Sequence, residues 1–309
     1  MSRAPHLLLA ISGHGYGHLA QCAPVINTLV RQLPGLRLTL MSALPEQLLR
    51  QRIKADFTCI DAETDPVLCM RSAWEVDMPA SLAVFREFYR RRTDLLDETR
   101  TQLRMLKPDL VLANIPWLLL TAAAQEGIPA IALSSLNWAV IFNGYFAGEP
   151  GAADIHEQIL AGYRAAEAFL APEPALPMPE LPNYRVLGPI ARLGTARPAR
   201  LREQLDLPAD TQLVLVGLGG INTGLPLANW PQPEGVAWLF PQALDLPRTD
   251  MIDCRGLDMP MIDLLASVDA VLTKPGYGTY TEAVCNGVPL LTLERPDWPE
   301  TAYLNAWAQ

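Results

Sequence analysis

Two glycine-rich turns in the sequence carry residue types that could do chemistry. The first, Gly13-His14-Gly15-Tyr16-Gly17-His18, lies near the start of the chain, and the second, Lys274-Pro275-Gly276-Tyr277-Gly278-Thr279, lies near its end. The apolar run before each turn predicts a strand. The run after it has apolar residues at helical spacing, which predicts a helix. Backbone amides at a helix N-terminus bind anions, and the first turn adds a histidine. Together the two turns predict group transfer from a nucleotide donor.

His18 is the candidate catalytic base of the first turn. It stands where the turn becomes a helix, and the positive end of a helix disfavours a protonated imidazole. A general base must be neutral, so this location favours catalysis; the alternative is a histidine that only caps or packs the turn. His14, Gly15 and Gly17 are candidate contacts with donor or acceptor. The spacing departs from the dinucleotide fingerprint, whose third glycine comes one residue later than Gly17.

The second turn has the features of an anion site. Gly276 and Gly278 allow close approach of the backbone, and the hydroxyl and amide of Thr279, at the expected helix start, can bind an oxyanion. Lys274 either adds a positive charge near a pyrophosphate or is solvated. Glu282 lies three residues beyond Thr279, where its carboxylate either caps the helix or accepts hydrogen bonds from a ribose diol.

A third glycine-rich loop, residues 217–222, is expected at the same edge as the second turn. The amides of Gly219 and Gly220 are candidate contacts with a phosphate or a transition state. The sequence lacks a G-x-x-x-x-G-K-[ST] loop, a D-x-D pair, a G-x-S-x-G elbow and an H-E-x-x-H helix. We therefore expect transfer without a metal, and no cofactor besides the donor co-substrate.

The elements that must position these turns alternate between strands and helices. Apolar runs from Leu7 to about Leu136 predict one alternating series, and a second series runs from Gln212 to Leu293. Such alternation predicts parallel sheets covered by helices on both faces, hence an α/β protein with two doubly wound domains. One long amphipathic helix is expected from Ser81 to Leu106. Its residues 90–92 are three arginines, which form either a solvated face or a contact with acidic headgroups or an anionic acceptor.

A cluster of prolines between residues 172 and 182 predicts the end of the first domain, since proline disrupts helices and central strands. Residues 184–190 are expected to form a short extended hinge. The predicted domains are therefore residues 1–185, on the acceptor side, and residues 186–309, which bind the donor.

Composition limits the classes of partner. The chain has 309 residues, of which 50% are hydrophobic, and a net charge of −9, which disfavours nucleic acid as a partner. Its five cysteines lack the spacing of a zinc site or a disulfide framework. Because no run of residues has the pattern of a signal peptide or a membrane span, we expect a cytoplasmic protein and leave peripheral membrane contact open. The sequence does not indicate an oligomeric state.

The chain resembles the GT-B glycosyltransferases, in particular the branch with the peptidoglycan enzyme that adds N-acetylglucosamine to lipid I and the glycosyltransferase-like part of plant arabinose kinases. The resemblance rests on residues 13–18, on Leu187-Gly188-Pro189, and on the stretch from Lys274 to Pro289. It implies two facing Rossmann-like domains and an inverting, metal-independent hexosyltransferase that moves a sugar from a UDP-sugar to an acceptor hydroxyl. The open alternatives are a nucleotide-sugar epimerase or hydrolase, and a non-catalytic module that binds nucleotide sugars.

The resemblance also implies roles for single residues. It implies that His18 deprotonates the acceptor, that residues 276–279 line the donor diphosphate, and that Glu282 holds the ribose. Residues 255–259 align with the segment that meets the nucleotide base, and Glu300 and Asn305 resemble positions beside the donor sugar. Family members continue beyond this segment into further helices, so the second domain is expected to be short at its C-terminus.

Acceptor specificity is expected where strands of the first domain end. Ligands in open parallel sheets bind beyond the carboxyl ends of the strands, which points to Ser134 and Ser135. Asn137 and Trp138 follow and are candidate contacts with donor or acceptor. Trp117 and Trp138 either stack on a sugar or fill the core.

Overall fold

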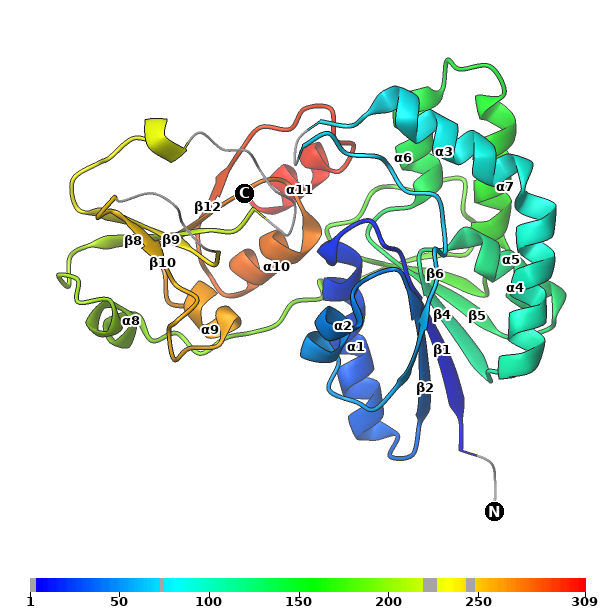
Figure 1. Cartoon of the computed structure of the whole chain (residues 1–309), viewed down its shortest axis with the longest axis horizontal. Helices are drawn as coiled ribbons and strands as arrows, with labels where there is room; N and C mark the ends of the chain where they lie inside the picture. The colour runs from blue at the N-terminus through cyan, green and yellow to red at the C-terminus, as the bar shows by residue number, and fades with distance from the viewer. Residues whose placement is uncertain (1–3, 73–74, 219–226, 243–247) are drawn as a thin grey trace. The chain divides into compact units, whose positions relative to one another are not determined.

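Two parallel β-sheets organise the chain, as the alternating apolar runs predict. The computed structural model describes residues 4–72, 75–218, 227–242 and 248–309. The chain divides into a first unit, which contains residues up to 71 and 75–190, and a second unit made mainly of residues 191–309. The first unit has a seven-stranded sheet and the second a five-stranded one, so the second is the smaller unit (Figure 1).

The sheet of the first unit has the strand order β3-β2-β1-β4-β5-β6-β7, and all neighbouring strands are parallel. Its strands are β1 (His6–Ile11), β2 (Arg37–Ser42), β3 (Thr58–Asp61), β4 (Leu110–Asn114), β5 (Ala130–Leu133), β6 (Ala168–Pro172) and β7 (Tyr184–Leu187). Because β1 pairs with both β2 and β4, the chain reverses its order of strand addition there, which is where open α/β sheets form ligand sites.

Helices cover both faces of this sheet (Figure 1). They are α1 (Tyr16–Gln32), α2 (Glu46–Arg52), α3 (Met78–Arg90), α4 (Arg92–Leu106), α5 (Trp117–Gln125), α6 (Trp138–Phe146) and α7 (Ala152–Arg164). Alternate residues of β1 point to one face, where Leu9 and Ile11 pack with Leu19 and Ile26 of α1. Burial of each such side chain contributes about 1.5–3 kcal/mol, so this packing holds α1, and the turn before it, against the sheet.

The helix expected from Ser81 to Leu106 is in fact two helices, α3 and α4. Asp77 begins α3 earlier than the apolar pattern indicates, because its carboxylate accepts a hydrogen bond from the amide of Ala80 at 3.1 Å. The break falls at Arg91, which has φ −90° and ψ 2°. The two helices have different neighbours, α7 for α3 and α5 for α4.

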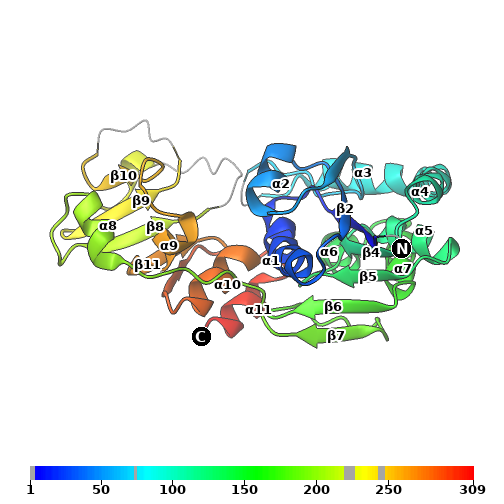
Figure 2. The ribbon, with the colours of Figure 1, turned by 90° about the horizontal axis from the view of Figure 1, so that it is seen from below.

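The segment expected as a hinge, residues 184–190, instead contributes β7 to the first sheet. Figure 2 shows β7 beside β6 at the edge of the sheet, paired in register from Phe169↔Tyr184 to Pro172↔Leu187. The proline cluster begins at the last residue of β6, Pro172, and continues in the loop before β7, where Leu176, Met178 and Leu181 are buried. Apolar residues among the prolines therefore keep the loop in the first unit, and residues 186–190, which the sequence analysis assigned to the second domain, lie in the first unit.

The second unit has the strand order β10-β9-β8-β11-β12, with parallel neighbours throughout. Side chains on alternate positions of β8 pack on opposite faces, with Leu213 and Leu215 in one apolar cluster and Val214 and Val216 in another. Its elements are α8 (Pro198–Gln204), β8 (Gln212–Val216), η1 (Leu227–Asn229), β9 (Val236–Phe240), β10 (Met251–Asp253), α9 (Met261–Leu265), β11 (Ala270–Thr273), α10 (Tyr277–Cys285), β12 (Leu290–Thr292) and α11 (Thr301–Trp307).

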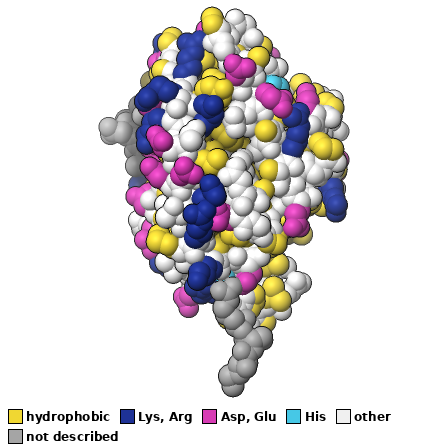
Figure 3. All heavy atoms as spheres, turned by 90° about the vertical axis from the view of Figure 1, so that its right-hand side faces the viewer, with side chains coloured by type: hydrophobic (Ala, Val, Ile, Leu, Met, Phe, Trp, Pro, Cys, Tyr) yellow, Lys and Arg dark blue, Asp and Glu magenta, His cyan; other side chains and the backbone are white. Residues whose placement is uncertain are grey.

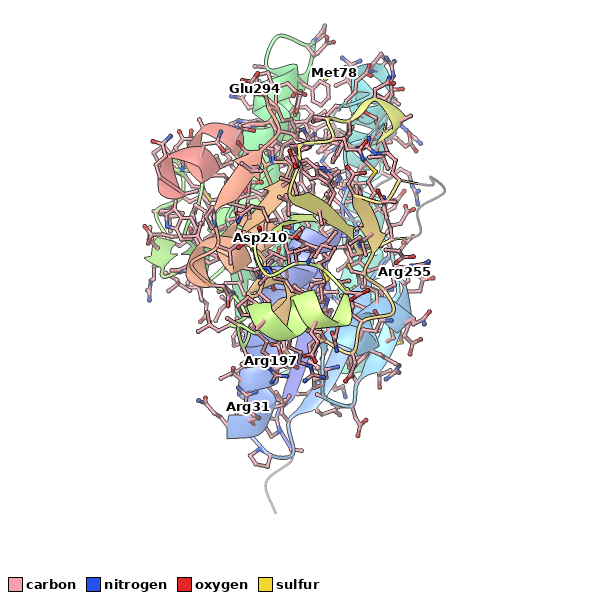
Figure 4. All side chains as sticks on the ribbon, turned by 90° about the vertical axis from the view of Figure 1, so that its left-hand side faces the viewer. Arg31, Met78, Arg197, Asp210, Arg255 and Glu294 are labelled. Carbon is pink, nitrogen blue, oxygen red and sulfur yellow. The ribbon has the colours of Figure 1, made fainter. Side chains whose placement is uncertain are left out.

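The chain enters the second unit along a segment, residues 191–197, whose backbone is held by side chains. The amide of Thr195 donates to Asp263 Oδ1 at 2.9 Å, and the amide of Arg197, labelled beside α8 in Figure 4, donates to Ser267 Oγ at 2.8 Å. These bonds hold the entering segment against α9 and the residues that follow it.

Candidate functional site

The first glycine-rich turn lies between β1 and α1, at the carboxyl end of the sheet. Gly15 precedes α1 with φ 102°, a left-handed conformation that favours glycine, so the turn requires this residue type. His18 is the third residue of the helix, and it is buried, with 6% of its surface exposed. The end of β1 pairs with the end of β4, Ile11 opposite Asn114, which brings a polar side chain of a distant strand next to the turn.

A hydrogen-bond network determines which nitrogen of His18 carries the proton. Nδ1 of His18 lies 2.7 Å from Oδ1 of Asn114, and Nδ2 of Asn114 donates to Oε1 of Gln21 at 3.1 Å. That same Oε1 accepts from the backbone amide of Ser135 at 3.3 Å, while Nε2 of Gln21 donates to Ser135 Oγ at 2.9 Å.

The backbone amide can only donate, and this fixes the orientation of both side-chain amides. Gln21 must turn its oxygen toward Ser135, so Asn114 turns its nitrogen toward Gln21 and its oxygen toward His18. An amide oxygen only accepts, so Nδ1 of His18 carries the proton and Nε2 keeps a lone pair. This is the tautomer that a base acting through Nε2 requires.

The charge state of His18 fits the same role. Burial lowers its pKa from 6.5 to about 4, against an opposing effect of the hydrogen bond to Asn114. The imidazole is therefore neutral at neutral pH and can accept a proton. Neither Asn114 nor Gln21 was singled out from the sequence; the signal for Asn114 was its place at the end of a predicted strand.

A buried carboxylate that the sequence analysis missed, Asp65, lies behind this turn. It accepts hydrogen bonds from Trp138 Nε1, from Thr64 Oγ1 and from the hydroxyl of Ser12. Burial raises its pKa from 3.8 to about 6, and the three hydrogen bonds oppose that rise. The ring of His14 meets Trp138 edge-on, with centroids 5.1 Å apart, so Asp65 and Trp138 support the turn from within the unit. No local motif marks Asp65.

The candidate acceptor residues are more deeply buried than the sequence analysis assumed. Trp117 and Trp138 are 2% and 0% exposed, so both rings fill the core and neither is exposed for stacking on a sugar. Ser134, Ser135 and Asn137 are also fully buried. Asn137 Oδ1 caps α6 by accepting from the amide of Val140 at 2.8 Å, whereas its Nδ2 makes no hydrogen bond within the described part of the chain. This donor of Asn137, which follows β5, is thus buried without a partner among the described residues.

The second glycine-rich turn lies between β11 and α10, in the second unit. Helix α10 begins at Tyr277, two residues before the expected start, so Thr279 lies within its first turn. Gly276 precedes the helix in an extended conformation, and no side chain caps α10. Glu282 is therefore not a cap, and the amides of residues 277–279 form the positive end of the helix.

The end of β8 lies near the start of α10. A side chain built on Gly217, which follows β8, would come within 3.4 Å of Thr279 Cγ2, so this part of the third loop lies at the same edge, as expected. Gly219 and Gly220 fall outside the described residues.

Buried charges surround this second turn. Burial and the charge of Arg295 lower the pKa of Lys274 from 10.5 to about 8, while Glu300 opposes the shift. Arg295 is 5% exposed, and its guanidinium lies 4.4 Å from the ring centroid of Trp298. Glu300, also 5% exposed, accepts from Trp298 Nε1 at 3.0 Å. Lys274 is thus partly withdrawn from water, and Arg295, which no motif indicated, joins it as a second cation.

Two of the residues implied to meet the donor have partners within the second unit. Glu282 Oε1 accepts from Nε of Arg192 at 2.6 Å. Asn305 Oδ1 accepts from the hydroxyl of Tyr280 at 2.7 Å, which ties α11 to α10. In the segment implied to meet the base, Arg255 pairs with Asp253 at the end of β10.

Comparison with known proteins places this architecture. No protein-family model matches the chain. The L-arabinokinase of Arabidopsis thaliana is 25% identical over 313 aligned residues, which cover 97% of this chain. The chain spans only 29% of the length of that relative.

Solved structures resemble the chain over nearly its whole length. Phytolacca americana UGT2, complexed with UDP-2fluoro-glucose and pterostilbene, matches with a TM-score of 0.59 at 15% identity, over 94% of this chain and 81% of that one. The calicheamicin glycosyltransferase CalG4 gives a TM-score of 0.61 at 17% identity, over 99% and 84%. The spinosyn rhamnosyltransferase SpnG gives 0.62 at 14% identity, over 97% and 82%.

The fold is that of the GT-B glycosyltransferases. The expected fold class, α/β with two doubly wound domains, is therefore confirmed, and the second unit is the smaller of the two. Within the described ranges of this GT-B chain, no helix has the length and apolarity to cross a bilayer, and no three His, Cys, Asp or Glu side chains come together as a metal-binding group.

The arginine run of the GT-B chain is engaged within its own helices. Arg90 pairs with Glu87 at 2.6 Å, and the guanidinium of Arg92 lies 4.3 Å from the ring centroid of Tyr89. On the face drawn in Figure 3, basic and acidic side chains are interspersed rather than gathered into one basic patch. These observations favour the solvated-face interpretation of residues 90–92.

Proposed function

We propose that this GT-B chain transfers a sugar from a nucleotide diphosphate sugar to an acceptor hydroxyl, with inversion at the anomeric carbon and without a metal. UDP-sugar is the proposed donor, the first unit binds the acceptor, and the second binds the donor. The observation that carries the proposal is the state of His18, a buried neutral imidazole whose Nε2 lone pair is fixed by Asn114.

In the proposed reaction His18 Nε2 takes the proton of the acceptor hydroxyl. The acceptor oxygen forms a bond to the anomeric carbon, and the bond from that carbon to the diphosphate oxygen breaks. The nucleoside diphosphate leaves with the electron pair of the broken bond, and the proton stays on His18 until it passes to solvent. General-base catalysis of this kind contributes about 10²–10⁴-fold to a rate.

The second turn supplies what the leaving group needs. Negative charge grows on the diphosphate as the bond breaks, and the amides of residues 277–279 and the cations of Lys274 and Arg295 stabilise it. In this proposal Glu282 accepts hydrogen bonds from the ribose hydroxyls, and Glu300 and Asn305 lie beside the sugar. Two solved relatives support a uridine donor, since Phytolacca UGT2 is complexed with UDP-2fluoro-glucose and Arabidopsis thaliana UGT89C1 with UDP.

The acceptor is the less defined substrate. Asn137 Nδ2, at the end of β5, offers a hydrogen-bond donor without a partner in the described part of the unit, which makes it the best supported polar contact for an acceptor. His14 is the second proposed contact, because its ring lies on the same turn as His18.

The test has two stages. Calorimetry first measures binding of UDP, GDP, dTDP and ADP to the protein and to Glu282→Ala, with Glu294→Ala, an exposed acid of the same unit, as the matched control (Figure 4). The protein is then incubated with sugar nucleotides that carry the base found to bind, together with a panel of hydroxyl acceptors, and mass spectrometry detects the products. We expect one nucleotide to bind, Glu282→Ala but not Glu294→Ala to weaken it, and a glycosylated acceptor to form.

Three other results would replace the proposal. Free sugar released equally with and without acceptor would indicate a hydrolase, and a changed sugar that stays on the nucleotide would indicate an epimerase. Binding without any turnover across the panel would favour the non-catalytic module.

A further inference from the structure

Arg192 stands next to the proposed ribose residue, and neither sequence motifs nor comparisons assign it a role. Its Nε donates to Glu282 Oε1 at 2.6 Å, shorter than an ordinary N–H···O hydrogen bond. The side chain of Glu282 is 15% exposed and that of Arg192 is 34% exposed. The carboxylate is thus largely removed from water, and this guanidinium compensates its charge.

The backbone that carries Arg192 is fixed to the same helix as Glu282. Asn286, one helical turn beyond Glu282, donates from Nδ2 to the carbonyl of Arg192 at 3.0 Å and accepts at Oδ1 from the amide of Gly194 at 2.8 Å. Gly194 also passes so close to Ile262 that a Cβ at this position would lie 2.3 Å from its carbonyl oxygen. The guanidinium is therefore held at a defined distance from α10.

The pair leaves Glu282 with directed hydrogen-bonding capacity. Arg192 engages Oε1 through Nε, which restricts the rotation of the carboxylate and leaves Oε2 and the remaining lone pair of Oε1 for other donors. Hydrogen bonds to a charged acceptor are roughly twice as strong as neutral ones and depend on geometry. A carboxylate held in this way can discriminate between sugars that differ by one hydroxyl.

We infer that Arg192 is a positioning residue that makes the donor site select ribonucleoside diphosphates over their 2′-deoxy counterparts. This inference rests on the proposed function of Glu282 as the ribose residue. With Arg192 present, the carboxylate meets the 2′-hydroxyl in a fixed geometry. Without it, the desolvated carboxylate turns toward water and its contact with the 2′-hydroxyl weakens.

Calorimetry with matched nucleotide pairs tests the inference. The probes are UDP and 2′-deoxy-UDP, and the same pairs for guanosine and adenosine. We expect the unmodified protein to prefer the ribonucleotide of one base by about tenfold. Arg192→Met should weaken that ribonucleotide about tenfold and leave its deoxy counterpart within about twofold, so that the preference disappears. Arg192→Lys should restore part of it.

A matched control separates this effect from the loss of any buried ion pair. Arg202 pairs with Asp269 at 2.7 Å and also donates to the carbonyl of Thr211. Both partners precede the amino ends of β8 and β11, at the opposite edge of the sheet from the second turn. Arg202→Met should keep the preference for the ribonucleotide. Glu282→Gln should reduce the preference, and adding Arg192→Met to it should have no further effect.

Each remaining outcome contradicts the inference. If Arg192→Met weakens both members of a pair equally, its role is structural only, and if it tightens the ribonucleotide, Arg192 competes with the ribose. An unchanged preference gives Arg192 no role in selection. If the unmodified protein binds no nucleoside diphosphate, the proposed donor function fails, a result distinct from binding that is insensitive to Arg192.

Discussion

The two glycine-rich turns begin their helices in the same way but hold opposite kinds of chemistry. Each follows a central strand of a parallel sheet, β1 or β11, and each is followed by a helix without a side-chain cap. The first turn is flanked by the neutral amides of Asn114 and Gln21, which hold a neutral His18. The second is flanked by two cations, the partly buried Lys274 and the buried Arg295.

The difference shows that the turn itself does not specify the function. A helix N-terminus favours negative charge and disfavours a protonated histidine, so the same local structure suits either an anion or a neutral base. What decides is the set of side chains brought in by neighbouring segments, Asn114 from β4 in one case and Arg295 from the loop after β12 in the other.

His18→Ala should break the first turn's function most severely. Removal of the base should lower the transfer rate about 10²–10⁴-fold, with donor affinity unchanged, because the donor is bound by the second turn. Initial rates of nucleotide release and calorimetry on the same variant check both parts. His156→Ala, on α7, is the matched control and should retain its rate. A loss of donor affinity in His18→Ala would contradict the division between the turns.

Lys274→Met should break the second turn's function through its charge. Loss of a cation beside the diphosphate should weaken nucleoside diphosphate binding about tenfold or more. Because the pKa of Lys274 is lowered to about 8, the free protein loses this cation as the pH rises through that value, and affinity should fall above pH 8.

The pH dependence provides the control for this variant. In Lys274→Met, affinity between pH 7 and 9 should be flat, since the titrating group is gone. Calorimetry across this range distinguishes the two proteins. The same decline above pH 8 in both would assign the titration to another group.

Asn114→Asp should replace the neutral partner of His18 with a charged one. A carboxylate beside Nδ1 favours the protonated imidazole and raises the pKa of His18 above about 4. The unmodified protein should keep its rate down to about pH 5, whereas the variant should lose activity at a pH about one to two units higher. A pH–rate profile measures this shift. Identical acid limbs would mean that His18 is not the titrating base.

Asp65→Asn should have the smallest effect, because the amide preserves the hydrogen bond from Trp138. The pKa of Asp65 is raised to about 6 in the folded state, above its unfolded value, so protonation stabilises the fold as the pH falls through about 6. The variant lacks this gain in stability, because its amide does not titrate. Between pH 7 and pH 5 its Tm should therefore gain less than that of the unmodified protein, by about 3 °C. Parallel Tm profiles would show that Asp65 does not titrate in this range.

The fold was largely predictable because apolar runs and breaks are local signals. Central strands such as β1 and β11 are short apolar segments, and α1 has a clear helical period. The pattern failed where packing overrode it. Helix α6 is apolar on most sides, so no period marked it, and β7 is an exposed edge strand preceded by prolines.

Of the candidate site, only the two glycine-rich turns were predictable from the sequence. His18 and Thr279 lie within turns that a glycine-rich pattern marks in the sequence. Asn114, by contrast, is 96 residues from its partner His18, and Arg192 is 90 residues from Glu282. Such partners are set by strand order and helix packing, which no local spacing records. Glu282 remains a predicted site residue, and its partner Arg192 and the partial burial of Lys274 depended on the tertiary structure.

The most direct test of the division between the turns is amide chemical-shift mapping of the isotope-labelled protein during titration with UDP. The division between the turns predicts shifts at the amides of residues 277–279 that saturate with UDP, while the amides of residues 13–18 and the ring signals of His18 stay in place. Saturable shifts at residues 13–18, with none at residues 277–279, would contradict it.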